Sequence, residues 1–347
     1  MSNALVTVFM TVFNGENYIK SSLESILNQT YKNIEILIFD DGSKDNTNNI
    51  IKSYKDSRIK LITNPRNMGI PYNRIKGLEL AKGKYLAIMD ADDISLPYRI
   101  QEQVNYMENN PNILAAGSFA KIFGKKFNNP VIKPNINPEE ISVALMFYNP
   151  LVNSTAIFRL DKVKKFGINY NPNYFVAQDY DFWAQLSKKG KISNIPKVLL
   201  KYRFGHNNIT KISNLTKLEK RKNIIHSIQN SLLEYYGFEL TGHEKQVFNN
   251  IFDENNPIMN EDTIKFGQLL INKMILINSK KNIFDSDVFK RVLNYSIEES
   301  FKKSKIDLWK KIKYWRFISN RSIFYIFIKS SYYSLRDLCK SLILKSS

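Results

Sequence analysis

The chain has very little cysteine and histidine, and its N-terminal apolar stretch is short. Its one cysteine, Cys339, excludes an internal disulfide, which suits a reducing compartment. The stretch LVTVFMTVF is too short to span a membrane and lacks the charged flank and the cleavage site of a secretory signal. We therefore expect a cytoplasmic protein.

Acidic residues are also in the minority, and the imbalance is local. The chain has 51 Lys plus Arg against 32 Asp plus Glu, a net charge of +19. From residue 301 to the end there are twelve Lys or Arg and two acidic residues, so roughly half of the excess lies in the last part of the chain. The first two hundred residues are far less basic, and no module typical of RNA or DNA binding is present. We therefore expect no nucleic-acid partner.

The first hundred residues alternate between apolar runs of strand type and helical periodicity. Strands alternating with helices predict a layered α/β sheet with parallel pairing. Four strands are expected, at Val6–Phe9, Ile34–Phe39, Ile59–Thr63 and Tyr85–Met89.

Polar clusters follow three of these strands. Thr11 comes after the first, the sequence Asp40-Asp41-Gly42-Ser43 after the second, and DADD at 90–93 after the fourth. In open α/β sheets ligands bind at the carboxyl ends of the strands. The pattern therefore predicts one shared site.

The DADD cluster gathers Asp90, Asp92 and Asp93 directly behind a strand of buried type. Carboxylates about 4 Å apart repel by roughly 1 kcal/mol even at the dielectric of water. A divalent cation would reverse this repulsion, since Mg²⁺ and Mn²⁺ prefer oxygen ligands and Mg²⁺ is commonly shared between carboxylates and substrate phosphates. We favour a metal site over the alternative, a solvated acidic loop.

Three segments together resemble the family 2 glycosyltransferases of the GT-A fold. They are VTVFMTVFNGENYIKSSLESILNQTYKNIEILIFDDGSKDNT, NMGIPYNRIKGLELAKGKYLAIMDADDISLP and AQDYDFWAQLSKKGKI, in this order and at suitable spacing. The resemblance covers about residues 4–205. It implies transfer of a sugar from a nucleotide diphosphate to an acceptor hydroxyl, in one step for inverting members.

The resemblance also assigns roles on the donor side. Thr11 and Phe13 match the base pocket, Asp41 an acid that binds the uracil ring with Asp40 beside it, and Arg74 a basic residue near the nucleotide. Asp90 matches the ribose position and Asp92 the metal ligand of the DxD motif, with Asp93 assisting. Three alternatives remain: Asp40 and Asp41 as part of a simple turn, Phe13 in the core, and Arg74 on a helix surface.

Two further residues belong to the catalytic step and to the metal. An acceptor hydroxyl needs a carboxylate base within hydrogen-bond reach. Asp179 in AQDYDFW matches the family's base, but Gln178 stands where the family often has Glu, so Asp181 stays a second candidate. Asp179 could also simply begin a helix. His206 matches a segment that supplies a metal or phosphate ligand in some relatives; the alternative is an exposed loop histidine.

The chain as a whole is expected to have three parts: a GT-A catalytic domain at 1–205, a helical extension at 206–300 and a basic, aromatic, amphipathic tail at 301–347. Apolar and lysine residues of the tail alternate at helical spacing, which favours a helix lying on an anionic membrane surface. Packing on the catalytic domain and binding of single-stranded nucleic acid are the alternatives.

The sequence thus predicts a metal-dependent, inverting glycosyltransferase that uses a nucleotide sugar, with a UDP-sugar favoured. The expected cofactor is Mg²⁺ or Mn²⁺, and the expected acceptor is a glycan, lipid-linked at the cytoplasmic face of the inner membrane, in surface polysaccharide or lipooligosaccharide assembly. A sugar-phosphate nucleotidyltransferase and a noncatalytic glycan- or lipid-binding protein are the alternatives. The oligomeric state does not follow from the sequence.

Overall fold

The computed structural model describes residues 3–124, 129–205, 218–253 and 257–304. The chain divides into two units, Met1–Tyr235 and Tyr236–Ser347. Helix α9 (Leu218–Tyr235) belongs to the first unit, where its Gln229 Nε2 donates to the Phe147 carbonyl at 2.7 Å. The first unit therefore extends beyond the expected catalytic domain at 1–205, and that boundary stays a prediction.

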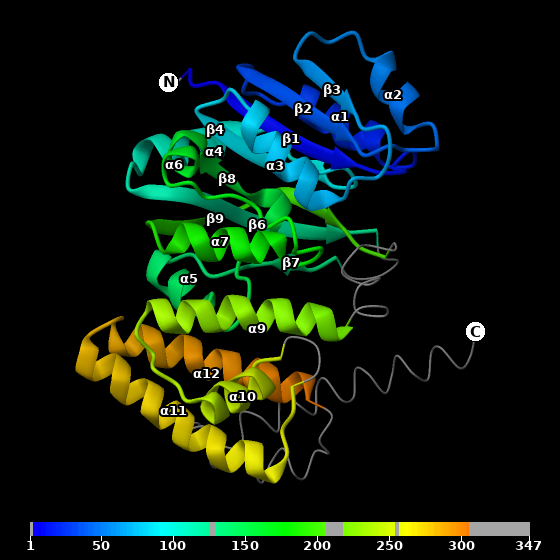
Figure 1. Ribbon diagram of the computed structural model, residues 1–347. Coiled ribbons are helices and arrows are strands. Elements are labelled where there is room, and N and C mark those ends of the chain that lie inside the picture. Colours follow the sequence, from blue (N-terminus) through cyan, green and yellow to red (C-terminus); the bar gives the residue numbers. More distant parts are fainter. Residues whose placement is uncertain (1–2, 125–128, 206–217, 254–256, 305–347) are drawn as a thin grey trace. The chain divides into compact units, whose positions relative to one another are not determined.

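The four expected strands form one half of the sheet. β1 (Val6–Val12), β2 (Ile34–Asp40), β3 (Ile59–Thr63) and β4 (Tyr85–Asp90) lie in the order β3-β2-β1-β4, and all three pairs are parallel. Each expected strand lies within the observed one. The carboxyl ends of β1, β2 and β4 therefore meet at one edge, as expected (Figure 1).

The other half of the sheet has mixed directions. β8 (Ile157–Arg159) pairs antiparallel with both β4 and β6 (Ile113–Phe123), and β6 runs parallel to the long β9 (Lys191–Arg203). The short strands β5 (Ile94–Ser95) and β7 (Val131–Ile132) pair with β9 and β6. β9 ends beside the turn after β4, so the two halves share one site edge.

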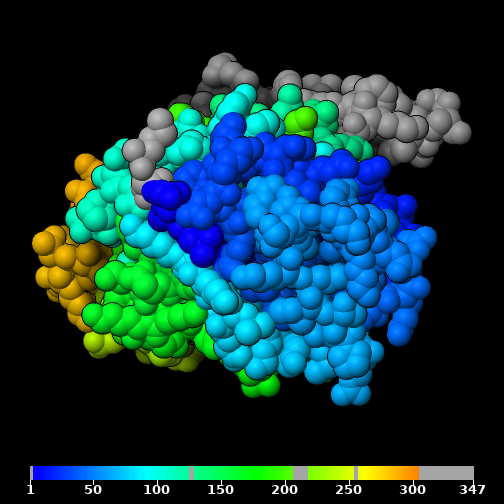
Figure 2. Space-filling model, turned by 90° about the horizontal axis from the view of Figure 1, so that it is seen from above, coloured from blue at the N-terminus to red at the C-terminus, as the bar shows by residue number. Residues whose placement is uncertain are grey.

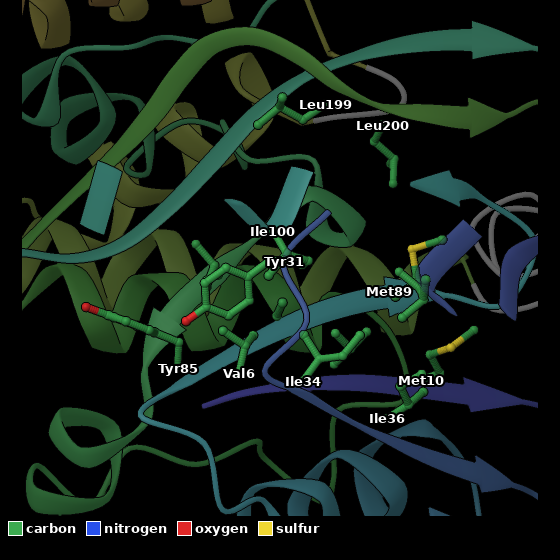
Figure 3. Packing of buried hydrophobic residues seen from close by; sticks show 14 of the residues in the cluster. Val6, Met10, Tyr31, Ile34, Ile36, Tyr85, Met89, Ile100, Leu199 and Leu200 are labelled. Carbon is green, nitrogen blue, oxygen red and sulfur yellow. The ribbon is translucent and has the colours of Figure 1, made fainter. Parts of the chain in front are cut away.

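One face of the sheet packs on α1 (Ile19–Leu27) and α4 (Arg99–Asn109). Alternate residues of β1, β2 and β4 point into this layer, because side chains of a strand alternate between faces. Figure 3 shows Val6, Met10, Ile34, Ile36 and Met89 in this layer, all of them buried. Ile19, Leu23 and Ile26 of α1 have no exposed surface, so the helical spacing in the sequence marks a true core face.

The opposite face carries α3 (Ile70–Leu80) and α7 (Gln178–Ser187). Gly77 of α3 lies so close to Phe9 that a Cβ there would be 2.2 Å from the ring. Phe182 and Trp183 of α7 pack on Phe158 of β8, with ring centroids 5.1 and 6.2 Å apart. These two helices carry three of the expected site residues: Arg74 on α3, and Asp179 and Asp181 on α7. Shorter helices complete the unit: α2 (Thr47–Ser53), α5 (Pro138–Ala144), α6 (Leu160–Lys165) and a 3₁₀ turn at Asn153–Thr155.

The second unit is helical where it is described. It contains α10 (Gly242–Ile251), α11 (Glu261–Lys281) and α12 (Ser286–Lys303). A capping box between Thr241 and Glu244 begins α10, and the side chains of Asn260 and Asp285 cap α11 and α12. No helix within the described residues is both long enough and apolar enough to cross a membrane. The tail from residue 305 lies outside the described residues.

Candidate active site

The site lies where β1, β2 and β4 end. In register, Thr11 of β1 stands between Phe39 of β2 and Asp90 of β4, and Val12 pairs with Asp40. Thr11 is half-buried, whereas Phe13 just beyond it is 47% exposed, which rules out a core position for Phe13. Figure 2 shows that the N-terminal part of the chain, coloured blue to cyan, makes up much of one face of the molecule, whereas the strands themselves are almost entirely buried.

The three aspartates of DADD have different surroundings. Asp90 and Asp92 are half-buried, while Asp93 is only 1% exposed. Both oxygens of Asp93 accept hydrogen bonds: Oδ2 from the Ser154 hydroxyl, and Oδ1 from the Arg203 backbone N–H at 2.8 Å. Asp93 therefore turns into the protein, where its carboxylate fixes the turn.

The carboxylates raise one another's pKa. Burial, followed by the charge of Asp92, raises the pKa of Asp90 to about 6. Burial, followed by the charge of Asp90, raises the pKa of Asp93 to about 8. The buried Arg99 guanidinium, whose pKa burial lowers to about 10, lies within electrostatic reach of both. Burial outweighs this positive charge, so in the absence of a cation the folded protein favours the protonated forms of both carboxyls.

A divalent cation with a diphosphate fits this turn. Carboxylate oxygens are the donors that Mg²⁺ and Mn²⁺ prefer, and a bound cation would favour the charged forms of these carboxyls. Within the described ranges, no three His, Cys, Asp or Glu side chains are grouped so that they could hold a metal by themselves. Asp93 is engaged on both oxygens, so the expected ligand Asp92 stays a prediction, and phosphate oxygens would have to supply further ligands. His206, the other expected ligand, lies outside the described residues.

The two acids after β2 hold loops together. Asp40 accepts from the Ser43 N–H at 3.0 Å and from Asn48 Nδ2 at 2.8 Å. Asp41 is 4% exposed and accepts from three donors on the segment that leads into α3: Asn64 Nδ2, the Met68 N–H and the Gly69 N–H, at 2.8 to 2.9 Å. Asp40 and Asp41 thus connect neighbouring loops by hydrogen bonds. Any contact of Asp41 with the uracil base would come in addition to this structural role.

Arg74 of α3 is buried rather than on the surface of its helix. It is 8% exposed, and its guanidinium lies over the Tyr170 ring, 5.3 Å from the centroid. It lies within electrostatic reach of Asp90. Its Nη1 has no hydrogen-bond partner among the described residues, although it is shielded from solvent. A buried, unpaired guanidinium nitrogen suits an anionic ligand.

The two candidate bases on α7 face different neighbours. Asp179 interacts electrostatically with Asp90, and its Oδ2 accepts from Asn149 Nδ2 at 3.0 Å. Asp181 instead accepts from Gln185 Nε2 at 2.7 Å, and burial raises its pKa. The helix is capped at Ala177, with φ at 55°, so Asp179 lies in the first turn and is not the cap residue. Of the two carboxylates, Asp179 is therefore the one that joins the DADD cluster.

The Tyr202 phenol of β9 lies within electrostatic reach of four aspartates. Burial raises the pKa of its phenol, and so do, in order of size, the charges of Asp90, Asp93, Asp92 and Asp179. Residues far apart in sequence therefore form one acidic cluster. Arg74 of α3 and Arg99 of α4 are the cations within electrostatic reach of Asp90 in this cluster.

Several residues of the site were not assigned from the sequence. Asn149 and Ser154 both lie in NPLVNSTAIFR, a polar stretch whose composition alone gives no role. Gln178, at the position that departs from the family, is 5% exposed, and its amide nitrogen lacks a partner in the described part of the chain. Tyr202 and Arg203 end an ordinary strand pattern. No local signal distinguishes these residues, because their partners lie on other elements.

Comparison with known proteins decides the family. The family model for glycosyl transferase family 2 matches residues 7–170. A glycosyltransferase of Haemophilus influenzae is 37% identical over 236 residues, which cover 63% of this chain and 72% of the relative. Another, of Methanocaldococcus jannaschii, is 34% identical over 263 residues and covers 73% of this chain and 84% of the relative. This chain belongs to the family 2 glycosyltransferases.

Named relatives and solved structures agree with this. WfgD of Escherichia coli, a UDP-Glc:alpha-D-GlcNAc-diphosphoundecaprenol beta-1,3-glucosyltransferase, is 33% identical over 227 residues, covering 64% of this chain and 85% of WfgD. The crystal structure of S. aureus TarS with UDP aligns with a TM-score of 0.55 and 16% identity over 86% of this chain and 91% of that chain. The expected GT-A fold is confirmed, and so is the expectation of a hexosyltransferase-type enzyme.

Proposed function

We propose that this glycosyltransferase moves a hexose from a UDP-sugar to a hydroxyl group of a glycan acceptor, in one inverting step that depends on Mg²⁺ or Mn²⁺. The observation that carries the proposal is the position of Asp179, whose Oδ2 accepts from Asn149 Nδ2 at 3.0 Å and which lies within electrostatic reach of Asp90. A carboxylate on α7 near the turn after β4 supports the proposal, because transfer to an acceptor hydroxyl needs a base close to the donor. A nucleotidyltransferase would need no such base.

Asp179 acts as the general base. Its carboxylate takes the proton of the acceptor hydroxyl while the oxygen attacks the anomeric carbon, and the bond from that carbon to the diphosphate oxygen breaks. Attack from the side opposite the leaving group inverts the anomeric centre. Asn149, which donates to Oδ2 of Asp179, orients the carboxylate so that the other oxygen is left to face the acceptor.

The donor is held at the edge formed by β1, β2 and β4. Thr11, Phe13 and Asp41 contact the base, Asp90 the ribose, and Arg74 a phosphate, which pairs its open Nη1. A divalent cation on Asp92, when bound, neutralises charge that develops on the leaving diphosphate. Arg74 adds positive charge on the same side, and Asp93 keeps the turn in shape.

The acceptor is a lipid-linked glycan in surface polysaccharide or lipooligosaccharide assembly. Support comes from the names of two Escherichia coli relatives, WfgD and WfaP, each a glucosyltransferase that uses UDP-Glc and a GlcNAc-diphosphoundecaprenol acceptor. Such an acceptor lies at a membrane, and the basic tail from residue 301 would bring the enzyme to the anionic cytoplasmic face. His206 is kept as a proposed metal or phosphate ligand.

The test is a panel of nucleotide sugars incubated with the enzyme and Mn²⁺, with slow donor hydrolysis as the readout. We expect one UDP-sugar to be hydrolysed fastest. Asp92→Asn should abolish both hydrolysis and metal-dependent UDP binding while the thermal unfolding curve keeps its shape. Full activity of Asp92→Asn, or of the wild type in excess EDTA, would refute the metal-dependent mechanism.

A further inference from the structure

Arg203, the last residue of β9, donates two hydrogen bonds to the DADD turn at 90–93. Its backbone N–H donates to Asp93 Oδ1 at 2.8 Å, and its side-chain Nε donates to the Asp92 carbonyl at 2.7 Å. Two consecutive residues of the turn are thus bound by one residue 110 positions away from Asp93. The first bond fixes a side chain and the second a peptide plane, so together they set the direction of the turn.

The guanidinium of Arg203 is held in turn by two aromatic rings. It lies 4.7 Å from the centroid of Tyr18 and 4.4 Å from that of Phe123. Tyr18 ends the loop between β1 and α1, the loop that begins at the proposed base pocket, and Phe123 ends β6. A planar guanidinium fits between rings while it donates sideways, which an ammonium group cannot do.

These contacts differ from those of the other arginines that bind backbone carbonyls. Arg99 and Arg159 are buried, and they donate to carbonyls of β4, α4 and β6, inside the core. Arg203 is half-buried, and its two hydrogen bonds both end on the turn with the metal candidate. A residue that only stabilised the fold would have no need to join the loop after β1, the DADD turn and the end of β6.

We propose that Arg203 is a positioning residue, which locks the Asp90–Asp93 turn in the form that holds the metal and the donor diphosphate. Tyr18 is the second part of this clamp, since its ring keeps the guanidinium in place. The inference rests on the metal-dependent donor site proposed above. It predicts that loss of the clamp weakens metal binding more than it weakens contacts to the uracil base, which lie outside the turn.

The test compares Arg203→Lys with the wild type in two titrations of the full-length chain. In the first, Mn²⁺ is titrated into the protein with saturating UDP, and bound Mn²⁺ is measured by electron paramagnetic resonance. In the second, UMP binding is measured in EDTA. We expect the variant to bind Mn²⁺ about 10- to 100-fold more weakly, the range known for residues that support a metal ligand. UMP affinity should fall less than Mn²⁺ affinity, because the residues proposed to contact the base, Thr11, Phe13 and Asp41, lie outside the Asp90–Asp93 turn.

Two further variants keep the test decisive. Arg58→Lys is the control, because Arg58 is also partly buried and donates to a backbone carbonyl, that of Leu27 at 3.1 Å, away from the site. It should leave both titrations unchanged. Tyr18→Leu removes one of the two rings that hold the guanidinium, and should weaken Mn²⁺ binding in the same direction if Arg203→Lys folds poorly.

The outcomes separate the two proposals. Wild-type Mn²⁺ affinity in both clamp variants, or an equal loss of UMP and Mn²⁺ binding, would overturn the positioning role and leave the proposed function standing. If the wild type itself binds UDP equally well with and without Mn²⁺, the metal-dependent function is wrong, and the role of Arg203 falls with it.

Discussion

Asp179 and Asp181 are two positions apart on α7, and the helix turns them toward different neighbours. Asp179 accepts a hydrogen bond from Asn149 and lies within electrostatic reach of Asp90. Asp181 accepts a hydrogen bond from Gln185 and lies within electrostatic reach of Lys188. Positions i and i+2 of a helix do not share a face. The resemblance favoured Asp179, and the sequence left Asp181 open because both carboxylates lie in the same short motif.

We expect Asp179→Asn to lower kcat by about a hundredfold or more, the scale of general-base catalysis, with donor affinity almost unchanged. Asp181→Asn should cost far less, since its carboxylate does not join the acidic cluster. The measurement is steady-state kinetics with the donor found in the panel, plus UDP binding for each variant. A larger kcat loss in Asp181→Asn would move the base to that residue.

Asp93 should make the stability of the protein depend on pH. Its pKa in the folded state is about 8, against roughly 3.9 for an ordinary aspartate. The folded state therefore keeps a proton that the unfolded state loses, and the free energy of unfolding falls as the pH rises from about 4 through 8. One such proton changes that free energy by at most about 1.4 kcal/mol per pH unit. Asp90, with a pKa of about 6, acts in the same direction.

The prediction is checked by melting temperatures in EDTA between pH 5 and pH 8.5. The wild type should lose stability across this range, and Asp93→Asn should lose less, so that the variant gains on the wild type as the pH rises. Asp56→Asn is the control: ion pairing with Arg58 lowers the pKa of Asp56 to about 2, so its contribution is constant above pH 5. Parallel curves for wild type and Asp93→Asn would show that Asp93 does not carry the effect.

At the scale of elements, α3 brings Arg74 to the site only because Gly77 allows the helix close to β1. A Cβ at Gly77 would lie 2.2 to 2.8 Å from three atoms of the Phe9 ring, and that ring is fixed against Phe39. Gly→Ala within a helix gains up to about 1 kcal/mol in helix propensity. Overpacking of a core typically costs about 1–3 kcal/mol, and here backbone or ring must move. The cost of the clash should therefore exceed the gain in helix propensity, so that Gly77→Ala is destabilising.

Gly77→Ala is thus expected to lower the free energy of unfolding and also UDP affinity, since the displaced helix carries Arg74. Urea unfolding and UDP titration measure the two effects. Gly242→Ala, where no atom lies within 4 Å of the new Cβ, is the matched control. Trimming the ring with Phe9→Leu in the Gly77→Ala background should restore part of both losses, and no recovery would argue against this contact as the cause.

The elements that the sequence predicted are those with strong local periodicity. The four parallel strands and α1 follow from apolar spacing over a few residues, and parallel order follows from their alternation with helices. The mixed half does not: β8 inserts between β4 and β6, and β9 passes through bulges against β6. These pairings join residues distant in the chain, which no local pattern records.

The same division applies within the site. Asp90, Asp92, Asp179 and Arg74 were assigned from the family resemblance, which rests on short motifs that are each local in the sequence. The inward turn of Asp93 could not, since it depends on Ser154 and Arg203, which are 61 and 110 residues away. Three neighbouring aspartates are chemically identical in a sequence, and only the fold gives each of them a different environment.

At the scale of the whole molecule, much of the excess positive charge lies in a different part of the chain from the proposed catalytic and donor-binding residues. Residues 305–347 hold ten Lys or Arg and two acidic residues, whereas every proposed donor-site residue lies before position 207. α12 ends at Lys303, and Phe301 is buried at 3% exposure. A truncation that tests the tail should therefore stop after Ser304, so that α12 keeps its last buried side chain.

We expect the protein cut after Ser304 to lose binding to vesicles that contain anionic phosphatidylglycerol and to keep hydrolysing the donor. Each Lys or Arg near an anionic surface contributes about 1 kcal/mol, less at high salt, and the apolar residues of the tail add burial. Full-length protein should accordingly leave the vesicles in part as salt rises, and should ignore neutral phosphatidylcholine vesicles. A sharp drop in melting temperature on truncation would instead favour packing of the tail on folded protein. Binding of single-stranded nucleic acid with a steep salt dependence, without vesicle binding, would exclude the membrane role, because release of counterions from phosphates and not lipid contact would then be what the lysines provide.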